Sequence, residues 1–255
     1  MGLVTLTTNF GARDPSAAAL KGVLYQLCPG ITLVDLAHQL PPDDLMESAL
    51  YLAGAIPYFP AGTIHLVNIN PGPAPIVVSV AGQYVVCPDN GVLTVLADAH
   101  PIEAIHAIAP LESGAQPSGQ IFYGREVFAP AVARLVNGEA PAALGDPLEA
   151  MVRLHLPRPS ETTDQWIKGE VIHVDDFGNL VTNIHRSLLE GIQPVKISIG
   201  GFSVGGLSHS FNDVPVGSPL ALYQAGGYLQ LAYRGDRADK RLRAGRGAAV
   251  KVVIA

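Results

Sequence analysis

The feature that most constrains the fold is an alternation of strand-like and helix-like segments in the first part of the chain. The strand-like runs are LVTLTT (3–8), ITLVDL (31–36) and TIHLVNI (63–69). The helix-like runs between them are PSAAALKGVLYQL (15–27) and PDDLMESALYLAGAI (42–56). This order is typical of βαβ units, whose strands pair in a parallel sheet. We predict an α/β domain over residues 1–155 with a largely parallel central sheet.

Two later segments extend this domain. The runs IVVSV (76–80) and QYVVC (83–87) are joined by Ala81-Gly82, which predicts a hairpin in the same sheet. The run REVFAPAVARLVNG (125–138) predicts a helix closed by Asn137-Gly138, with Pro130 either kinking it or marking a late start.

The composition changes at LPRPSETTDQ (156–165), a polar, proline-bearing run that we interpret as a linker. Short alternating strands with frequent glycine follow over residues 166–255, which predicts a smaller all-β domain, a barrel or a sandwich. Such a chain has two places for a ligand: the carboxyl ends of the parallel strands and the seam between the domains.

Several classes of protein are disfavoured by the sequence. Pro, Gly or Ser interrupts the apolar stretches well short of the roughly 20 residues of a membrane span, and no signal peptide follows Met1, so we expect a cytoplasmic protein. With a net charge of −6 the chain is an unlikely partner for nucleic acid. The basic cluster RGDRADKRLRAGR (234–246) is interpreted as a solvated helix face, with an anion contact as the alternative.

The eight histidines show no metal-ligand spacing, and no phosphate-binding glycine loop or nucleophile elbow is present. Cys28 and Cys87 form no disulfide framework and are interpreted as small buried hydrophobic residues. We therefore expect neither a metal nor a cofactor.

Polar residues follow the ends of two predicted parallel strands. Asn9, Asp14 and Ser16 come after the first, although Asp14 and Ser16 could equally cap the helix that follows. Asn70 comes after the third, in VNINPGPAP (67–75). The prolines predict that Asn70 is held in an extended conformation with its side chain aimed in one direction. The alternative is a solvent-facing asparagine in a tight turn.

Two further segments carry candidate binding residues. In IFYGREVF (121–128), Phe122, Tyr123 and Gly124 precede a helix, where free N–H groups could hold an anion. In VDDFGNLVTNI (174–184), Asp175, Phe177 and Asn179 lie on a predicted turn, and an aromatic beside an amide suits stacking on and reading of a base. The alternative is a β-turn whose phenylalanine fills the core.

Together these segments resemble the S-adenosylmethionine hydrolases (hydroxide adenosyltransferases), which share their fold with the fluorinase and chlorinase enzymes. The matching segments occur in the family's order: TTNFG (7–11), KGVLYQLCPGITLVDLAHQLPPDD (21–44), YFPAGTIHLVNINPG (58–72), PDNGVL (88–93), FYGREVFAP (122–130), DDFGNLVTNI (175–184) and GYLQLA (227–232).

The resemblance implies a homotrimer in which the β domain completes the site of a neighbouring subunit. It implies attack by water or halide on the 5′ carbon of S-adenosylmethionine (SAM), with methionine leaving. A sulfonium is already a good leaving group, so the protein need only align and desolvate the nucleophile. By this resemblance Asp14, Ser16, Asp175, Phe177 and Asn179 match residues that the family uses for the amino acid ammonium and the adenine.

The chain departs from the hydrolases where they hold the attacking water. Asn70, Val77 and Tyr123 stand where the family has aspartate, arginine and histidine. Asn9 replaces an aspartate that accepts both ribose hydroxyls, and an amide offers one acceptor oxygen instead of two. Weaker diol binding is expected.

Two other positions also differ from parts of the family. Gly124 resembles the halogenases, where serine or glycine borders the halide pocket, but only VSVAGQ (78–83) stands where those enzymes have an inserted loop. Ala225 and Gly226 occupy the turn that reaches the methionine carboxylate. The sequence favours a SAM or adenosine binder with weak or altered adenosyl transfer to water; a non-catalytic binder is the alternative, and a chloride-using halogenase is less favoured.

Overall fold

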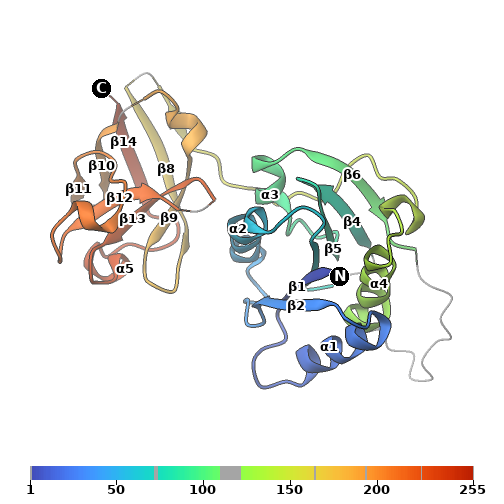
Figure 1. The fold of residues 1–255 in the computed structure, drawn as a ribbon. Coiled ribbons are helices and arrows are strands. Elements are labelled where there is room, and N and C mark those ends of the chain that lie inside the picture. The colour runs from blue at the N-terminus through green and yellow to red at the C-terminus, as the bar shows by residue number, and fades with distance from the viewer. Residues whose placement is uncertain are drawn as a thin grey trace. The chain divides into compact units, whose positions relative to one another are not determined.

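The computed structural model describes residues 2–71, 74–109, 122–163, 165–192, 194–224 and 226–254. The chain divides into two compact units, Met1–Leu154 and His155–Ala255 (Figure 1). Within the described ranges, no helix is long and apolar enough to cross a membrane.

The N-terminal unit is built on a mixed sheet with the order β2-β1-β3-β5-β4-β6. Its strands are β1 (Leu3–Thr8), β2 (Thr32–Ala37), β3 (Ile64–Asn68), β4 (Pro75–Val80), β5 (Gln83–Pro88) and β6 (Ile102–Ala107). The neighbours from β2 to β5 run parallel, whereas β4 pairs antiparallel with both β5 and β6. The predicted parallel core and the predicted hairpin are both confirmed, and both hairpin turn residues, Ala81 and Gly82, have positive φ, as a type I′ turn requires.

Helices cover both faces of this sheet (Figure 1). They are α1 (Ser16–Leu27), α2 (Leu45–Ala55), α3 (Thr94–Ala99) and α4 (Ala129–Val136), with short 3₁₀ turns at Ile56–Tyr58 and Pro141–Ala143. On one face, Leu20 and Leu24 of α1 and Val132 of α4 pack in one core with Leu6 of β1 and Leu66 of β3. Because strand side chains alternate, the last residues of β1 and β3 that share this face, Thr8 and Asn68, lie side by side at the sheet edge.

A π-helical turn, η2 (Gly124–Phe128), leads into α4. The N–H of Ala129 donates to the carbonyl of Gly124, five residues back. Pro130 is the second residue of α4, so of the two alternatives for this proline the late start is the one observed. The helix ends as predicted at Asn137, and Gly138 follows with a φ of 88°.

The C-terminal unit is antiparallel, with the order β11-β10-β14-β8-β9-β13-β12. Its strands are β7 (Glu161–Thr162), β8 (Trp166–Val174), β9 (Leu180–His185), β10 (Pro194–Ile199), β11 (Phe202–Val204), β12 (Pro219–Tyr223), β13 (Tyr228–Tyr233) and β14 (Ala249–Ile254). The end strands β11 and β12 contact each other, so the sheet is nearly closed around one apolar core. This agrees with the predicted all-β architecture, and β7, which pairs with β8, lies inside the predicted linker.

Short 3₁₀ turns at Arg186–Leu189 and Phe211–Asp213 and the short helix α5 (Ala238–Arg241) complete this unit. The basic cluster surrounds α5. Arg237 pairs with Asp239 at 3.0 Å and Arg241 with Asp236 at 2.6 Å, and both arginine side chains are exposed. The interpretation as a solvated face is confirmed.

Candidate functional site

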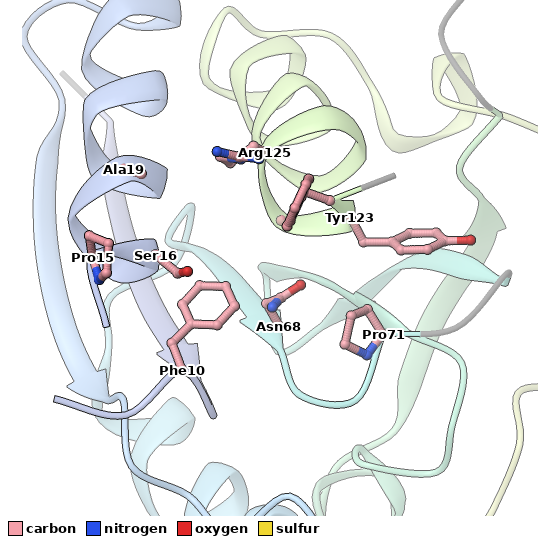
Figure 2. Close-up of a pocket in the computed structure, with 10 residues that line it drawn as sticks. Phe10, Pro15, Ser16, Ala19, Asn68, Pro71, Tyr123 and Arg125 are labelled. Atoms are coloured by element: carbon pink, nitrogen blue, oxygen red, sulfur yellow. The ribbon is translucent and has the colours of Figure 1, made fainter. Parts of the chain in front are cut away.

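A cavity of about 400 Å³ opens at the carboxyl ends of β1 and β3, between the start of α1 and the turn η2 (Figure 2). The residues that line it are Phe10, Pro15, Ser16, Ala19, Asn68, Pro71, Phe122, Tyr123, Gly124 and Arg125. The carboxyl edge of parallel strands is where ligands of α/β domains bind. The cavity therefore lies in one of the two places that the sequence predicted.

Four predicted site residues meet at this cavity: Ser16, Phe122, Tyr123 and Gly124. Asp14 is exposed beside it, and its Oδ1 accepts the N–H of Ser16 at 2.8 Å. The Ser16 hydroxyl and backbone N–H hold the pKa of this carboxyl below its usual range. Asp14 therefore accepts the N–H of the first residue of α1, but it is not the N-cap, because that residue is Pro15 and the cap makes no side-chain hydrogen bond.

The predicted extended conformation of Asn70 is wrong, since its φ is 44°, in the left-handed region. Asparagine tolerates this region better than other non-glycine residues, and its hydrogen bonds favour it here over the preference of a pre-proline residue. Its Nδ2 donates to the carbonyl of Pro42, and its own carbonyl accepts from Asn90 Nδ2 at 3.3 Å. Tertiary hydrogen bonds, and not the prolines alone, direct this side chain.

Asn9 and Asn70 are bonded to each other. Asn9 Nδ2 donates to Asn70 Oδ1 at 2.7 Å. Two carboxylates could not make this bond, because neither would supply a donor. The two positions where the resemblance implies aspartates therefore form one amide pair beside the cavity, next in sequence to the lining residues Phe10 and Pro71.

The other two replaced positions lie in different environments. Val77 is fully buried in the core of the N-terminal unit, opposite Val86, and is not among the lining residues, so an arginine there would have to displace core side chains. Tyr123 lines the cavity, but its hydroxyl points away from Asn68 (Figure 2). Among the described lining residues, none carries a carboxylate or an imidazole. This wall offers no group that accepts a proton near neutral pH.

One of the N–H groups at Phe122–Gly124 that were predicted to hold an anion already has a partner within the chain. The N–H of Phe122 donates to Glu126 Oε2 at 3.3 Å. The Arg125 guanidinium carbon lies 4.3 Å from the centre of the Phe122 ring, a cation–π contact at the cavity wall.

Sequence reasoning missed Phe10 and Asn68. Asn68 is 2% exposed, and its Oδ1 is buried without a hydrogen-bond partner. A signal was available, because Ile64, Leu66 and Asn68 share one face of β3 by alternation and the first two are core residues. A polar residue that continues an apolar stripe is costly unless something pairs with it.

In the C-terminal unit, Asp175 organises the predicted turn. Its Oδ1 accepts the N–H groups of Phe177 at 3.0 Å and of Asn179 at 2.8 Å, and its Oδ2 accepts Asn179 Nδ2 at 2.8 Å. Asn179 is buried, whereas Phe177 is 77% exposed. The alternative that Phe177 fills the core of this chain is therefore wrong.

Of the predicted turn at 225 and 226, Ala225 lies outside the described residues. The N–H of Gly226 donates to Gln224 Oε1 at 2.9 Å. A Cβ added to Gly226 would lie 2.7 Å from Gln224 Nε2, so a larger residue would require this side chain to move.

His65 and the two cysteines have structural roles, as their burial and contacts show. His65 is fully buried, with Nδ1 2.7 Å from Thr5 Oγ1 and Nε2 2.6 Å from Gln83 Oε1, and burial lowers its pKa to about 4. Cys28 and Cys87 are free and buried, as predicted, and burial raises the pKa of both thiols. Among the described residues, no group of three or more His, Cys, Asp or Glu side chains could hold a metal ion.

Comparison with known proteins agrees with this arrangement. The sequence model of the SAM hydroxide adenosyltransferase N-terminal domain matches residues 4–145, and that of the C-terminal domain matches residues 169–251. The chain is 34% identical to an (R)-S-adenosyl-L-methionine hydrolase of Thermus thermophilus, over 98% of this chain and 99% of the relative. It is 30% identical to a fluorinase of an Actinoplanes species, over 90% of each chain.

Among solved structures, an uncharacterized conserved protein from Thermotoga maritima matches with a TM-score of 0.84 and 28% identity, over 98% of this chain and 99% of the other. A conserved hypothetical protein from Thermus thermophilus matches with a TM-score of 0.77 and 32% identity, over 99% of this chain and 100% of the other. Both domain matches, the full-length relatives and the cavity at the strand ends lead to one conclusion: the chain belongs to the SAM hydroxide adenosyltransferase family.

Proposed function

We propose that this protein binds SAM and transfers its 5′-adenosyl group slowly to water, giving adenosine and methionine. The observation that carries the proposal is the cavity in the matched N-terminal domain, whose walls include Ser16, Phe122, Tyr123 and Gly124. The relatives named as hydrolases act on the (R) form of SAM, and we extend that preference for the sulfonium configuration to this chain.

The proposed reaction needs little chemical assistance. The water oxygen forms a bond to C5′ while the C5′–S bond breaks, and the bonding electron pair returns to sulfur, which leaves as the neutral thioether of methionine. The water then releases one proton to solvent. The protein's part is to hold water in line with the sulfonium and to exclude competing solvent.

The described cavity wall has no carboxylate or imidazole to act as a general base; Asn70 is an amide and Val77 lies in the core. General-base assistance contributes about 10²- to 10⁴-fold. We therefore expect turnover slower by about that factor than in a relative that keeps the aspartate, arginine and histidine.

The test is a product assay by liquid chromatography and mass spectrometry, with each sulfonium epimer of SAM supplied separately. The native chain is compared with Asn70→Asp/Tyr123→His, which restores titratable groups without burying an arginine at position 77. Faster adenosine formation by the double variant would support the proposal. A native rate equal to that of an intact hydrolase would contradict the missing-base argument.

The second candidate is a non-catalytic SAM or nucleoside binder. It is favoured by the Asn9–Asn70 amide pair, which replaces two charged family residues with groups satisfied by each other. Mass spectrometry of ligand carried through purification separates the candidates. Intact SAM in the purified protein, with no products after prolonged incubation, would favour the binder.

A chloride-using halogenase is the third, less favoured candidate. Gly124 beside the cavity and the similarity to fluorinases support it, but the buried Asn68 Oδ1 next to Gly124 presents the negative end of a dipole, which disfavours an anion. We expect no 5′-chloro-5′-deoxyadenosine when chloride is added with SAM.

We also propose that the protein works as a homotrimer in which the Asp175–Asn179 turn meets the cavity of a neighbouring subunit. The supporting observation is Phe177, a large apolar ring left 77% exposed on a turn whose polar groups bond to one another. Light scattering at micromolar concentration tests the assembly, and a monomer would contradict it.

A further inference from the structure

The cavity contains one buried polar atom that the protein leaves unpaired. Asn68 is the last residue of β3 and is 2% exposed, yet its Oδ1 has no hydrogen-bond partner. An unsatisfied buried carbonyl costs stability, so its presence in a cavity wall calls for a partner from outside the chain.

The neighbours of Asn68 cannot supply that partner. Thr8 lies beside it in the sheet, but the Thr8 hydroxyl is 2.9 Å from His38 Nδ1 and also accepts the N–H of Phe10 at 3.4 Å. The Phe10 ring offers no donor. Figure 2 shows the Asn68 oxygen directed toward the turn that carries Tyr123, while the Tyr123 hydroxyl points elsewhere.

Gly124 leaves the space above this oxygen open. A Cβ added to Gly124 would lie 3.4 Å from Asn68 Oδ1 and 3.6 Å from Phe10 Cζ. A glycine at this position therefore leaves room for a small group between the turn η2 and the end of β3, within reach of the unpaired oxygen.

We propose that Asn68 is a catalytic residue whose Oδ1 accepts a hydrogen bond from the attacking water, and afterwards from the 5′-hydroxyl that this water becomes. The inference rests on the proposed function. It transfers the water-holding role to a residue outside the replaced set, because Asn70 Oδ1 already accepts from Asn9 and Val77 lies in the core.

The chemistry suits a neutral nucleophile. As the water oxygen attacks C5′ it gains positive charge, and an amide oxygen stabilises the O–H groups that carry this charge without taking the proton. The proton passes to solvent once the C–O bond has formed. A halide has no hydrogen to donate and would face the oxygen unfavourably.

The test uses binding, so it does not require turnover. Isothermal titration calorimetry compares adenosine with 5′-deoxyadenosine, which lacks only the 5′-hydroxyl. The native protein should bind adenosine about threefold to tenfold more tightly, as expected for one net hydrogen bond. Asn68→Val should bind the two nucleosides equally, whereas Asn68→Asp, which keeps an acceptor oxygen, should retain the preference.

The outcomes separate this inference from the proposed function. A native protein that binds neither nucleoside nor SAM would overturn the proposed function itself. Native binding of adenosine with no preference over 5′-deoxyadenosine, or a preference that survives in Asn68→Val, would overturn the role of Asn68 alone. Loss of the preference in Asn68→Asp would overturn the assignment of Oδ1 as acceptor, since the amide NH₂ would then be the contacting group.

Discussion

The cavity at the end of β3 and the Asp175 turn differ in how their polar groups are satisfied. In the turn, the Asp175 carboxylate accepts three hydrogen bonds, and the exposed Phe177 ring is the part left for a partner. In the cavity, the Asn68 oxygen is buried and unpaired among largely apolar walls. The polar groups of the turn are hydrogen-bonded within the chain, and its exposed ring is free to contact a partner. The cavity wall has an acceptor whose hydrogen bond can be made only by a donor that enters the cavity.

Changes to the two regions should therefore affect stability and function differently. Satisfied polar groups hold the fold, so removing them should cost stability. A buried polar group without a hydrogen-bond partner lowers stability, and it is kept at a site because it binds a ligand. Removing such a group should therefore reduce ligand binding or activity without reducing stability.

The largest effect on stability is expected from His65, which lies on the same strand as Asn68 but is fully satisfied. Its folded pKa of about 4 lies below the ordinary 6.5. As pH falls below 6.5, the unfolded chain binds a proton that the folded chain refuses, so stability is lost progressively until about pH 4. The loss attributable to this residue is about 3 kcal/mol. Urea unfolding across this pH range measures it.

The matched control is His65→Gln, which cannot titrate. The quantity to compare is the slope of its unfolding free energy against pH, and not its stability at neutral pH. A variant that loses stability with acid as steeply as the native protein would show that other groups govern the response.

Phe177→Ala should weaken adenosine binding by about 1 to 3 kcal/mol through lost stacking, and leave the unfolding free energy nearly unchanged, because the ring is 77% exposed. Calorimetry and urea unfolding on the same preparation check both halves. Unchanged affinity would exclude the turn from the binding site.

Asp175→Ala should cost about 1 to 3 kcal/mol of stability, because it removes three acceptor contacts and leaves the buried Asn179 amide without its partner. Asp176→Ala is the matched control, since the Asp176 contact to Arg237 is made by its backbone carbonyl. Equal stability of the two variants would contradict the picture of a preformed turn.

The smallest effect on stability is expected at Asn68. Asn68→Val should leave stability unchanged or raise it by up to about 1 kcal/mol, because an unpaired polar group is replaced by an apolar one in a strand. Asn90→Ala is the comparison, since Asn90 donates to the carbonyl of Ile69 at 2.9 Å and accepts from Val92 at 3.2 Å. Thermal unfolding that placed Asn68→Val below Asn90→Ala would mean that the Asn68 amide is paired in solution.

Much of the fold could be predicted from local patterns. The alternation over 1–155 identified the parallel strands, the main helices and the β4–β5 hairpin, because each depends on short-range periodicity or on a two-residue turn. It did not predict α3 or β6, which complete the sheet and its cover. Their residues carry no clear period, and long-range packing decides their structure.

The candidate site was predicted less completely. Ser16 was found because it follows the end of the first parallel strand, where ligands of α/β sheets bind, and Gly124 was found because it precedes a helix. Asn68 was missed because it belongs to a strand, and its place in the cavity wall depends on the turn η2, which is distant in the sequence. The conformation of Asn70 was wrong because a local rule for residues before proline was outweighed by bonds to Pro42, Asn9 and Asn90.

The amide pair of Asn9 and Asn70 also limits how this chain could exchange with a relative that has aspartate at these positions. Asn70→Asp keeps an acceptor for Asn9 Nδ2 and strengthens that bond with charge, at the cost of facing the Pro42 carbonyl with an oxygen. Asn9→Asp reaches a similar state, because the Asn70 amide can turn to donate to the new carboxylate, and its oxygen then faces the Pro42 carbonyl. Either path therefore meets the same obstacle, and a change in the backbone around Pro42 would open both.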